Sequence, residues 1–316
     1  MAETGEMTAA RLPDGERLFL SDGGLETTLI FEGGFDLPCF ASYPLLRDDA
    51  GIEALRRYYL SFLEIARREG TGFVFDVPTW RANADWGRQL GDSAAMLAEV
   101  NREAVELGEE IRAGAESAET PIAISGAIGP QGDAYDPAQL LSAEDAQRYH
   151  SPQVESLAAA GADMVGALTL CYVEEAIGIA RAAAASAIPA AISFTLETDG
   201  RLPSGQALGD AIEQVDTETD GAPSYFMVNC AHPSHFADVI ARDEPWLRRL
   251  GGIRANASRM SHAELDEASE LDSGDPAELG AEYRALKPHL PHTRVLGGCC
   301  GTDHRHVGSV CRSWLA

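Results

Sequence analysis

The sequence predicts a single (β/α)8 barrel over residues 17–316, and three observations lead to that prediction. Short apolar runs alternate with longer stretches of helical periodicity eight times along the chain. No linker or change of composition interrupts this alternation, and 316 residues is an ordinary length for one barrel. Polar or sulfur-bearing residues follow most of the apolar runs, which is where barrel enzymes place their catalytic groups.

The first half of the chain contains four predicted strand–helix units after a leader. Residues 1–16 contain no long apolar run and are expected to form a flexible leader rather than a signal peptide. Ile52, Leu55 and Tyr59 recur at helical spacing in a segment that stops at Gly70. The four strands are expected at 18–20, 72–75, 122–125 and 163–168, and the helices at 44–70, 92–114, 142–160 and 173–187.

The second half continues the alternation to the end of the chain. Strands are expected at 190–195, 225–228, 252–255 and 294–296, and helices at 207–215, 235–250, 262–271, 276–289 and 303–314. The alternative is an open doubly wound sheet. It is disfavoured because no Gly-x-Gly-x-x-Gly motif opens the first helix.

The charge of the chain narrows its partners and its compartment. The formal net charge is −26, and Lys287 is the only lysine, which argues against binding to nucleic acid or to an anionic membrane. No apolar run approaches the roughly 20 residues that span a bilayer. Six cysteines in a chain of this length fit a reducing cytoplasm, and a monomer or homodimer is expected.

Three cysteines are the strongest candidates for chemistry. Cys299 and Cys300 are adjacent after the last predicted strand, and Cys230 follows the sixth. Adjacent cysteines at a strand end are poor core material, but both sulfurs can reach one metal ion there. Three thiolates that leave one coordination position open are typical of a catalytic Zn²⁺ site. Strands two apart lie about 10 Å from each other, so short loops can bring the sulfurs onto one ion.

Other interpretations of these sulfurs remain open at this point. The three cysteines are also compatible with packed core thiols. His232, His304 or His306 lies close enough in sequence to complete a structural four-ligand site, although the helices that follow are expected to direct them away. The remaining thiols are interpreted as packed or surface groups: Cys39, Cys171 and Cys311.

Polar and aromatic side chains at the other strand ends are candidates for binding substrate. They are Asp22, Glu26, Asp76, Trp80, Thr195 and Asn256. A free thiol has a pKa of about 8.5 and is a weak nucleophile at neutral pH, and bound Zn²⁺ would hold it as the thiolate. Trp80 and Tyr135 are candidate walls for a cationic methyl donor through cation–π attraction.

Four motifs together resemble the homocysteine S-methyltransferase family. They begin at Asp22 (Asp-Gly-Gly-Leu-Glu-Thr-Thr), Ser125 (Ser-Gly-Ala-Ile-Gly-Pro), Val228 (Val-Asn-Cys-Ala-His-Pro) and Gly297 (Gly-Gly-Cys-Cys-Gly). The resemblance runs from about residue 18 to residue 314. It implies a zinc-dependent barrel that moves a methyl group from a sulfonium or quaternary ammonium donor to homocysteine and so forms methionine.

The resemblance also assigns residues. It implies that zinc is bound by Cys230, Cys299 and Cys300. It places Asp22 and Glu26, the candidate catalytic residues, near the thiol amino acid, and Asn229 matches the residue before the first ligand.

The amino-acid half of the predicted site departs from the family pattern. Leu168 stands where the family usually has a Glu that can hold the ammonium of the substrate. Residues 254–257 and 76–80 also differ from the usual Tyr-Pro-Asn-Ser and Thr-Asn-Thr-Tyr. Two hypotheses follow: either Asp22, Glu26 or Asp76 takes over the ammonium, or the acceptor is another thiol or a selenol. A non-catalytic zinc- or thiol-binding barrel is the further alternative.

Overall fold

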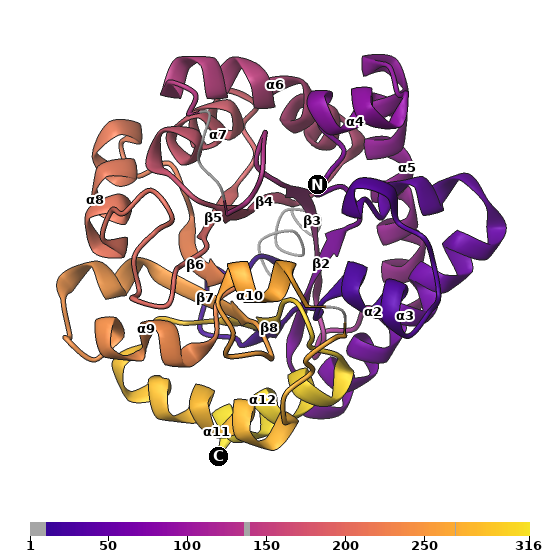
Figure 1. The fold of residues 1–316 in the computed structure, drawn as a ribbon. Helices are drawn as coiled ribbons and strands as arrows, with labels where there is room; N and C mark the ends of the chain where they lie inside the picture. Colours follow the sequence, from indigo (N-terminus) through magenta and orange to yellow (C-terminus); the bar gives the residue numbers. More distant parts are fainter. Residues whose placement is uncertain (1–10, 136–139, 269) are drawn as a thin grey trace.

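The chain forms a closed barrel of eight parallel strands in sequence order, β1 to β8, with helices around it (Figure 1). The structure is a computed structural model and describes residues 11–135, 140–268 and 270–316. Each strand pairs with its sequence neighbours, and β1 pairs with β8 to close the ring. The predicted barrel is therefore confirmed, and the open-sheet alternative is excluded.

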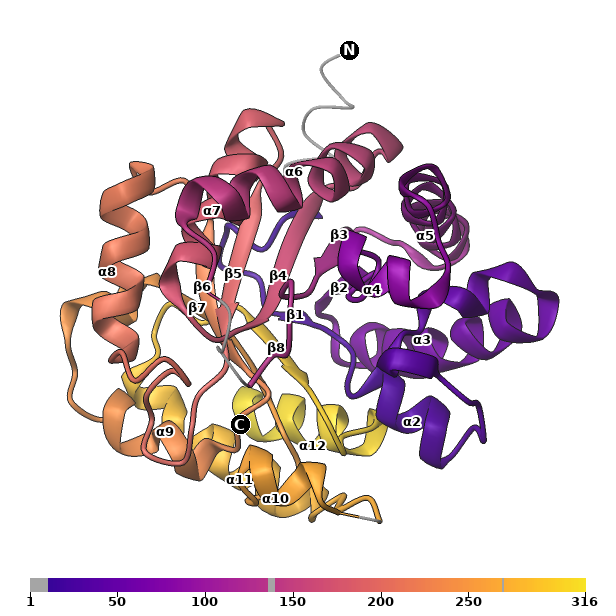
Figure 2. The same ribbon diagram turned by 45° about the horizontal axis from the view of Figure 1, so that its top comes forward.

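All eight predicted strands are present, and every residue in them is buried. Their bounds are β1 Phe19–Leu20, β2 Gly72–Val77, β3 Ile122–Ile128, β4 Met164–Leu170, β5 Ala190–Phe194, β6 Tyr225–Asn229, β7 Leu250–Ala255 and β8 Val295–Gly298. Burial on both faces explains why these segments appear as near-continuous apolar runs in the sequence. Figure 2 shows the strands running together inside the ring of helices.

Helices follow the strands and form the outer layer. The α-helices are α2 Leu25–Phe31, α3 Asp49–Glu69, α4 Ala84–Leu90, α5 Ala94–Ala115, α6 Ala143–Ala160, α7 Val173–Ala185, α8 Leu208–Thr219, α9 Pro233–Ile240, α10 His262–Asp266, α11 Pro276–Leu286 and α12 His304–Leu315. Short 3-10 turns are η1 Pro38–Phe40, η2 Tyr43–Arg47, η3 Pro245–Arg249 and η4 Lys287–His289.

Several predicted helix bounds were wrong, and local chemistry gives the reasons. The predicted helix 235–250 ends at Ile240, because Asp243 adopts a positive φ of 53° and Pro245 opens a separate 3-10 turn. The predicted helix 44–70 starts at Asp49, where the Asp48 side chain accepts a hydrogen bond from Gly51 N at 2.8 Å. The predicted helix 262–271 is shorter, since α10 ends at Asp266.

The barrel interior and the layer between strands and helices are packed separately. One cluster of buried side chains fills the inside of the barrel: Phe19, Val74, Ala127, Met164, Leu168, Ala191, Tyr225, Met227 and Val295. A much larger cluster joins the outer face of the strands to the helices. The interior is thus a packed core that supports whatever lies on top of it, as in other barrels of this kind.

The described part of the predicted leader is attached to the barrel wall. Arg11 donates from Nε and Nη2 to the carboxylate of Glu116, at 2.9 Å and 2.7 Å. Residues 1–10 of the predicted leader lie outside the described residues. Among the described helices, none has the length and apolar character needed to cross a bilayer.

Candidate active site

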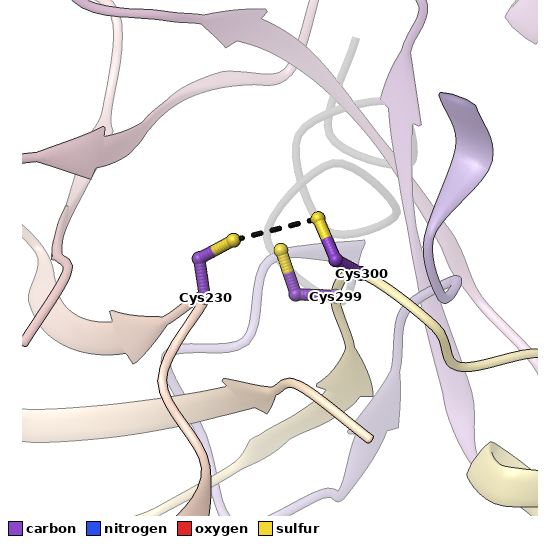
Figure 3. Close-up of side chains that lie close together, drawn as sticks. All are labelled: Cys230, Cys299 and Cys300. Carbon is purple, nitrogen blue, oxygen red and sulfur yellow. Dashed lines mark hydrogen bonds between the residues drawn. The ribbon is translucent and has the colours of Figure 1, made fainter. Parts of the chain in front are cut away.

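Three cysteine sulfurs converge at the carboxyl ends of β6 and β8 (Figure 3). Cys230 Sγ lies 3.6 Å from Cys300 Sγ, and all three sulfurs of Cys230, Cys299 and Cys300 lie within 4.8 Å of one another. Bonds of about 2.3 Å from a tetrahedral Zn²⁺ ion separate two sulfurs by roughly 3.8 Å. The cluster therefore has the spacing that one zinc ion requires.

The backbone around the cysteines is fixed by hydrogen bonds between β6, β7 and β8. Cys230 N donates to Arg254 O at 3.1 Å, and Cys299 N donates to Ala255 O at 2.8 Å. Thr302 Oγ1 donates to Cys299 O at 2.7 Å. The segment after β8 thus presents both adjacent sulfurs from a rigid turn, as metal ligation needs.

Hydrogen bonds within the cluster favour one thiolate. They hold the pKa of the Cys299 thiol well below its ordinary value, with the nearby Arg254 guanidinium acting in the same direction against burial. A thiol that ionises readily is the form that binds a metal ion. The same hydrogen bonds raise the pKa of the Cys230 and Cys300 thiols, so Cys299 is the one ligand of the three that the cluster itself favours as a thiolate.

The neighbouring histidines are occupied elsewhere. His232 Nδ1 accepts from Ser234 N at 3.2 Å, and its Nε2 lies 3.1 Å from Glu282 Oε2. The His306 ring contacts Asp303 and the Ser273 carbonyl. In the described part of the chain, the only group of three or more possible metal ligands is the three cysteines. Three ligands would leave a tetrahedral ion one coordination position for a substrate, which a structural four-ligand site would not.

Asn229 connects the cysteines to the end of β4. Its Oδ1 accepts from Thr169 N at 2.8 Å and from Ser193 Oγ at 2.6 Å. Its Nδ2 donates to Thr169 Oγ1 at 2.8 Å and lies 3.8 Å from Cys299 Sγ. Thr169 and Cys230 both have positive φ angles, 64° and 56°, which non-glycine residues rarely adopt. Asn229 thus holds strained backbone in place beside the sulfurs.

A cavity of about 80 Å³ adjoins all three cysteines. Its polar and aromatic lining includes Asp22, Glu26, Asp76, Trp80, Tyr135, Thr169, Asn229 and Arg254. Leu168 and Ala127 contribute apolar wall. The structure therefore brings together every candidate substrate-binding residue at this cavity except Thr195 and Asn256.

Those two residues have other positions. Thr195 is buried, and its Oγ1 donates to Cys230 O at 3.3 Å, so it holds the backbone of Cys230 in place and does not line the cavity. Asn256 lines a second cavity of about 450 Å³, and its buried Oδ1 has no hydrogen-bond partner among the described residues. Trp80, Tyr135 and Cys300 line both cavities, so the two spaces meet at the sulfur cluster.

The aromatic side chains at this junction are held in place. Tyr135 Oη lies 2.9 Å from Cys230 Sγ, and its ring stacks on His262 with centroids 4.0 Å apart. Trp80 Nε1 donates to Leu168 O at 3.2 Å. The Arg81 guanidinium lies 4.1 Å from the Trp80 ring centroid, so this ring already has a cation on one face.

Arg254 is the site residue that sequence reasoning missed. It is the penultimate residue of β7 and is buried, and its Nη1 and Nη2 donate to the carboxylates of Asp76 and Asp22. Its Nε donates to Gly298 O at 3.2 Å. The signal in the sequence was an arginine within an otherwise apolar strand, where a charge is costly unless it is paired.

Burial changes the ionisation of both aspartates. It raises the pKa of Asp22 to about 7, although Arg254 opposes the shift. It also raises the pKa of Asp76, again against Arg254. The guanidinium is therefore what makes two neighbouring buried carboxylates tolerable at neutral pH.

This chain is similar to known proteins over nearly its whole length. The family model described as homocysteine S-methyltransferase matches residues 19–313. Homocysteine S-methyltransferase 4 of Zea mays is 24% identical over 323 residues, covering 92% of this chain and 88% of that protein. The oxidized form of the homocysteine methyltransferase MmuM of Escherichia coli has a TM-score of 0.73 at 22% identity, covering 96% of this chain and 98% of that one. The metallated form of MmuM has a TM-score of 0.70 at 21% identity, covering 94% and 96%.

Barrel, sulfur cluster and family match together define this protein as an enzyme, a methyltransferase built on a (β/α)8 barrel. The chain belongs to the homocysteine S-methyltransferase family, over nearly its whole length. The resemblance inferred from the four sequence motifs is thereby confirmed.

Proposed function

We propose that this protein is a zinc-dependent S-methyltransferase that moves a methyl group from a sulfonium donor, S-methylmethionine or S-adenosylmethionine, to homocysteine and forms methionine. The observation that supports this most directly is the cluster of Cys230, Cys299 and Cys300 at the wall of a cavity. The names of the maize and Escherichia coli relatives, and the existence of a metallated form of the latter, agree with it.

Cys230, Cys299 and Cys300 would hold the zinc ion. Bound zinc would lower the pKa of the acceptor thiol, so that this thiol would react as a thiolate at neutral pH. The residues around it position the reactants. Asn229 fixes the strand ends on which the sulfurs sit, and Thr195 supports the Cys230 carbonyl. Such outer hydrogen bonds determine how well a metal site holds its geometry.

The methyl transfer balances without any redox partner. The acceptor thiol loses its proton to solvent, its sulfur forms the new bond to the methyl carbon, and the donor C–S bond breaks. The donor sulfonium becomes a neutral thioether. The protein mainly aligns the two sulfurs, which is a proximity effect.

We call the cavity of about 80 Å³ beside the three cysteines the acceptor cavity, and propose that the cavity of about 450 Å³ binds the methyl donor. Asn256 lines it, while Tyr135 and Trp80 stand where it meets the acceptor cavity beside Cys300. Aromatic faces attract a sulfonium cation, and Tyr135 is proposed for this role because the Trp80 ring already has the Arg81 guanidinium on one face. Asp22 and Glu26 border the acceptor cavity and are the proposed catalytic and substrate-binding carboxylates.

A methyl-transfer assay tests this proposal. Zinc-loaded protein is given homocysteine with S-methylmethionine, S-adenosylmethionine and betaine in turn, and Cys299→Ala is the control. Methionine from one sulfonium donor, absent in the control, is the expected result and names the donor. One bound zinc per chain without methionine from any donor contradicts the proposal.

Leu168 favours a second candidate, transfer to a different thiol or a selenol. Its apolar side chain lines the acceptor cavity where an ammonium-binding group would be useful. An acceptor panel in the same assay separates the two, because this candidate requires another acceptor to outperform homocysteine. The cytoplasmic location and the monomeric or dimeric state remain predictions.

A further inference from the structure

The acceptor cavity contains four ionisable groups that decide which end groups it can bind. They are the carboxylates of Asp22, Glu26 and Asp76 and the guanidinium of Arg254. An acceptor that carries an ammonium needs a carboxylate oxygen whose lone pairs are free and that does not lie against a cation. The hydrogen bonds of the three carboxylates show which of them meets that requirement.

Asp22 and Asp76 are both engaged by Arg254. Asp22 Oδ1 accepts from Arg254 Nη2, and its Oδ2 accepts from Tyr58 Oη at 3.0 Å. Asp76 Oδ2 accepts from Arg254 Nη1. An ammonium placed against either carboxylate would also be close to the guanidinium, and the two like charges repel strongly in a buried site.

Glu26 is the carboxylate that remains available. It lies in the first turn of α2, and its Oε1 accepts from Ser42 Oγ at 2.8 Å. No side chain among the described residues donates to its Oε2, and this residue lines the same cavity as the cysteines. Burial raises the pKa of Glu26, while the Ser42 hydrogen bond and the charge of Arg81 oppose that shift. Arg81 makes no ion pair with Glu26 among the described residues, so an arriving ammonium can contact the carboxylate directly and stabilise its ionised form.

The wall at the end of β4 offers no competing group. Leu168 is apolar, and Thr169 Oγ1 already accepts from Asn229 Nδ2 at 2.8 Å. The available carboxylate, Glu26 in α2, therefore lies on a different element of the cavity wall from Leu168 in β4, which carries no charge.

We propose that Glu26 receives the ammonium of the acceptor, because Arg254 already occupies the carboxylates of Asp22 and Asp76. This inference rests on the proposed function, because it assumes that the acceptor thiol is held at the cysteine cluster. It assigns the acceptor to the α-amino thiols and makes Glu26 the specificity-determining residue. Leu168, at the position where the family usually has a Glu, then means that the ammonium-binding group has moved to α2 and has not been lost.

Binding titrations test the role of Glu26 without turnover. Zinc-loaded protein is titrated by calorimetry with homocysteine and with its des-amino analogue, which has the same thiol and carboxylate but no ammonium. Wild type is expected to prefer homocysteine. Glu26→Gln is expected to weaken homocysteine binding by about tenfold to a hundredfold, as for a charge-assisted hydrogen bond, and to leave the analogue within about twofold.

Glu32→Gln is the matched control, since it removes the same charge from an exposed position after the same helix. It should leave both affinities unchanged. Equal affinity of wild type for the two thiols would overturn the inference, and so would an equal effect of Glu26→Gln on both. Because no donor is present, these outcomes differ from failure of the proposed function, which is homocysteine binding without methyl transfer from any donor.

Discussion

At the scale of single residues, the paired charges of Arg254 dominate the floor of the site. Its partners Asp76 and Asp22 lie 178 and 232 residues away in the sequence, so no local pattern could reveal the contact. The cysteines were predictable because their residue type and their place after strands already imply a metal. A buried arginine implies only that partners exist, and the fold alone identifies them.

Replacing Arg254 by Leu is expected to destabilise the protein by about 3–5 kcal/mol at neutral pH, because two buried carboxylates lose their counterion. Burial raises the pKa values of Asp22 and Asp76, so their unfavourable ionisation grows as pH rises. The loss should therefore be larger at pH 8 than at pH 5. Chemical denaturation at both pH values measures it. Arg248→Leu at an exposed position is the control, and a loss below about 1 kcal/mol for Arg254→Leu would refute the expectation.

Gly24 is a second residue whose role depends on close approach. A Cβ there would lie 2.7 Å from Cys299 O, although its φ of −80° suits any residue. Gly24→Ala should displace the Cys299 backbone, cost about 1–3 kcal/mol, and weaken zinc binding measured by competition with a chromogenic chelator. Gly114→Ala in α5 has no atom within 4 Å of the new Cβ and should leave zinc affinity as it is. Unchanged zinc affinity in Gly24→Ala would contradict the steric argument.

At the scale of elements, strands were predicted better than helix ends. Apolar runs mark strands buried on both faces, and all eight were found in order. The helix over 235–250 was misjudged because its apolar spacing continues across a turn that Asp243 and Pro245 impose. Helix α4 was missed because, at seven residues, it is too short for periodicity to show.

Helix α12 offers a pH-dependent test of an element that supports the site from outside. Asp303 caps it by accepting from Arg305 N at 2.8 Å and His306 N at 3.4 Å. Burial opposes its ionisation, but hydrogen bonds from His306 and Arg305 hold the pKa of Asp303 well below its usual range. A carboxyl with a depressed folded-state pKa stabilises above its unfolded pKa of about 3.9 and loses that contribution as pH falls.

Asp303→Ala should therefore cost about 1–2 kcal/mol at pH 7, and the difference from wild type should shrink towards pH 3. Urea denaturation across this range measures it. Asp275→Ala, at the equivalent cap of α11, is the comparison, because Asp275 also accepts from two backbone N–H groups but receives no hydrogen bond from a ring or a guanidinium among the described residues. A pH-independent loss in Asp303→Ala would show that the cap acts without its charge.

At the scale of the whole molecule, the cysteine cluster joins the ends of β6 and β8 on opposite sides of β7, so a metal ion bound there would tie these two strands together at the top of the barrel. A ligand that binds only the folded state raises the free energy of unfolding with the logarithm of its free concentration divided by the dissociation constant. The gain is about 4 kcal/mol when the free ligand is at a thousandfold excess over the dissociation constant. Zinc removal by a chelator should therefore lower the melting temperature, and Cys299→Ala should start lower and respond less. Thiolate ligands bind protons in competition with zinc, so the stabilisation should fade as pH drops from 8 to 5. Calorimetry with and without chelator measures both effects. Identical melting temperatures for the zinc-loaded and stripped wild type would mean that the ion binds the folded and unfolded chain equally. The ion would then contribute nothing to the stability of the barrel.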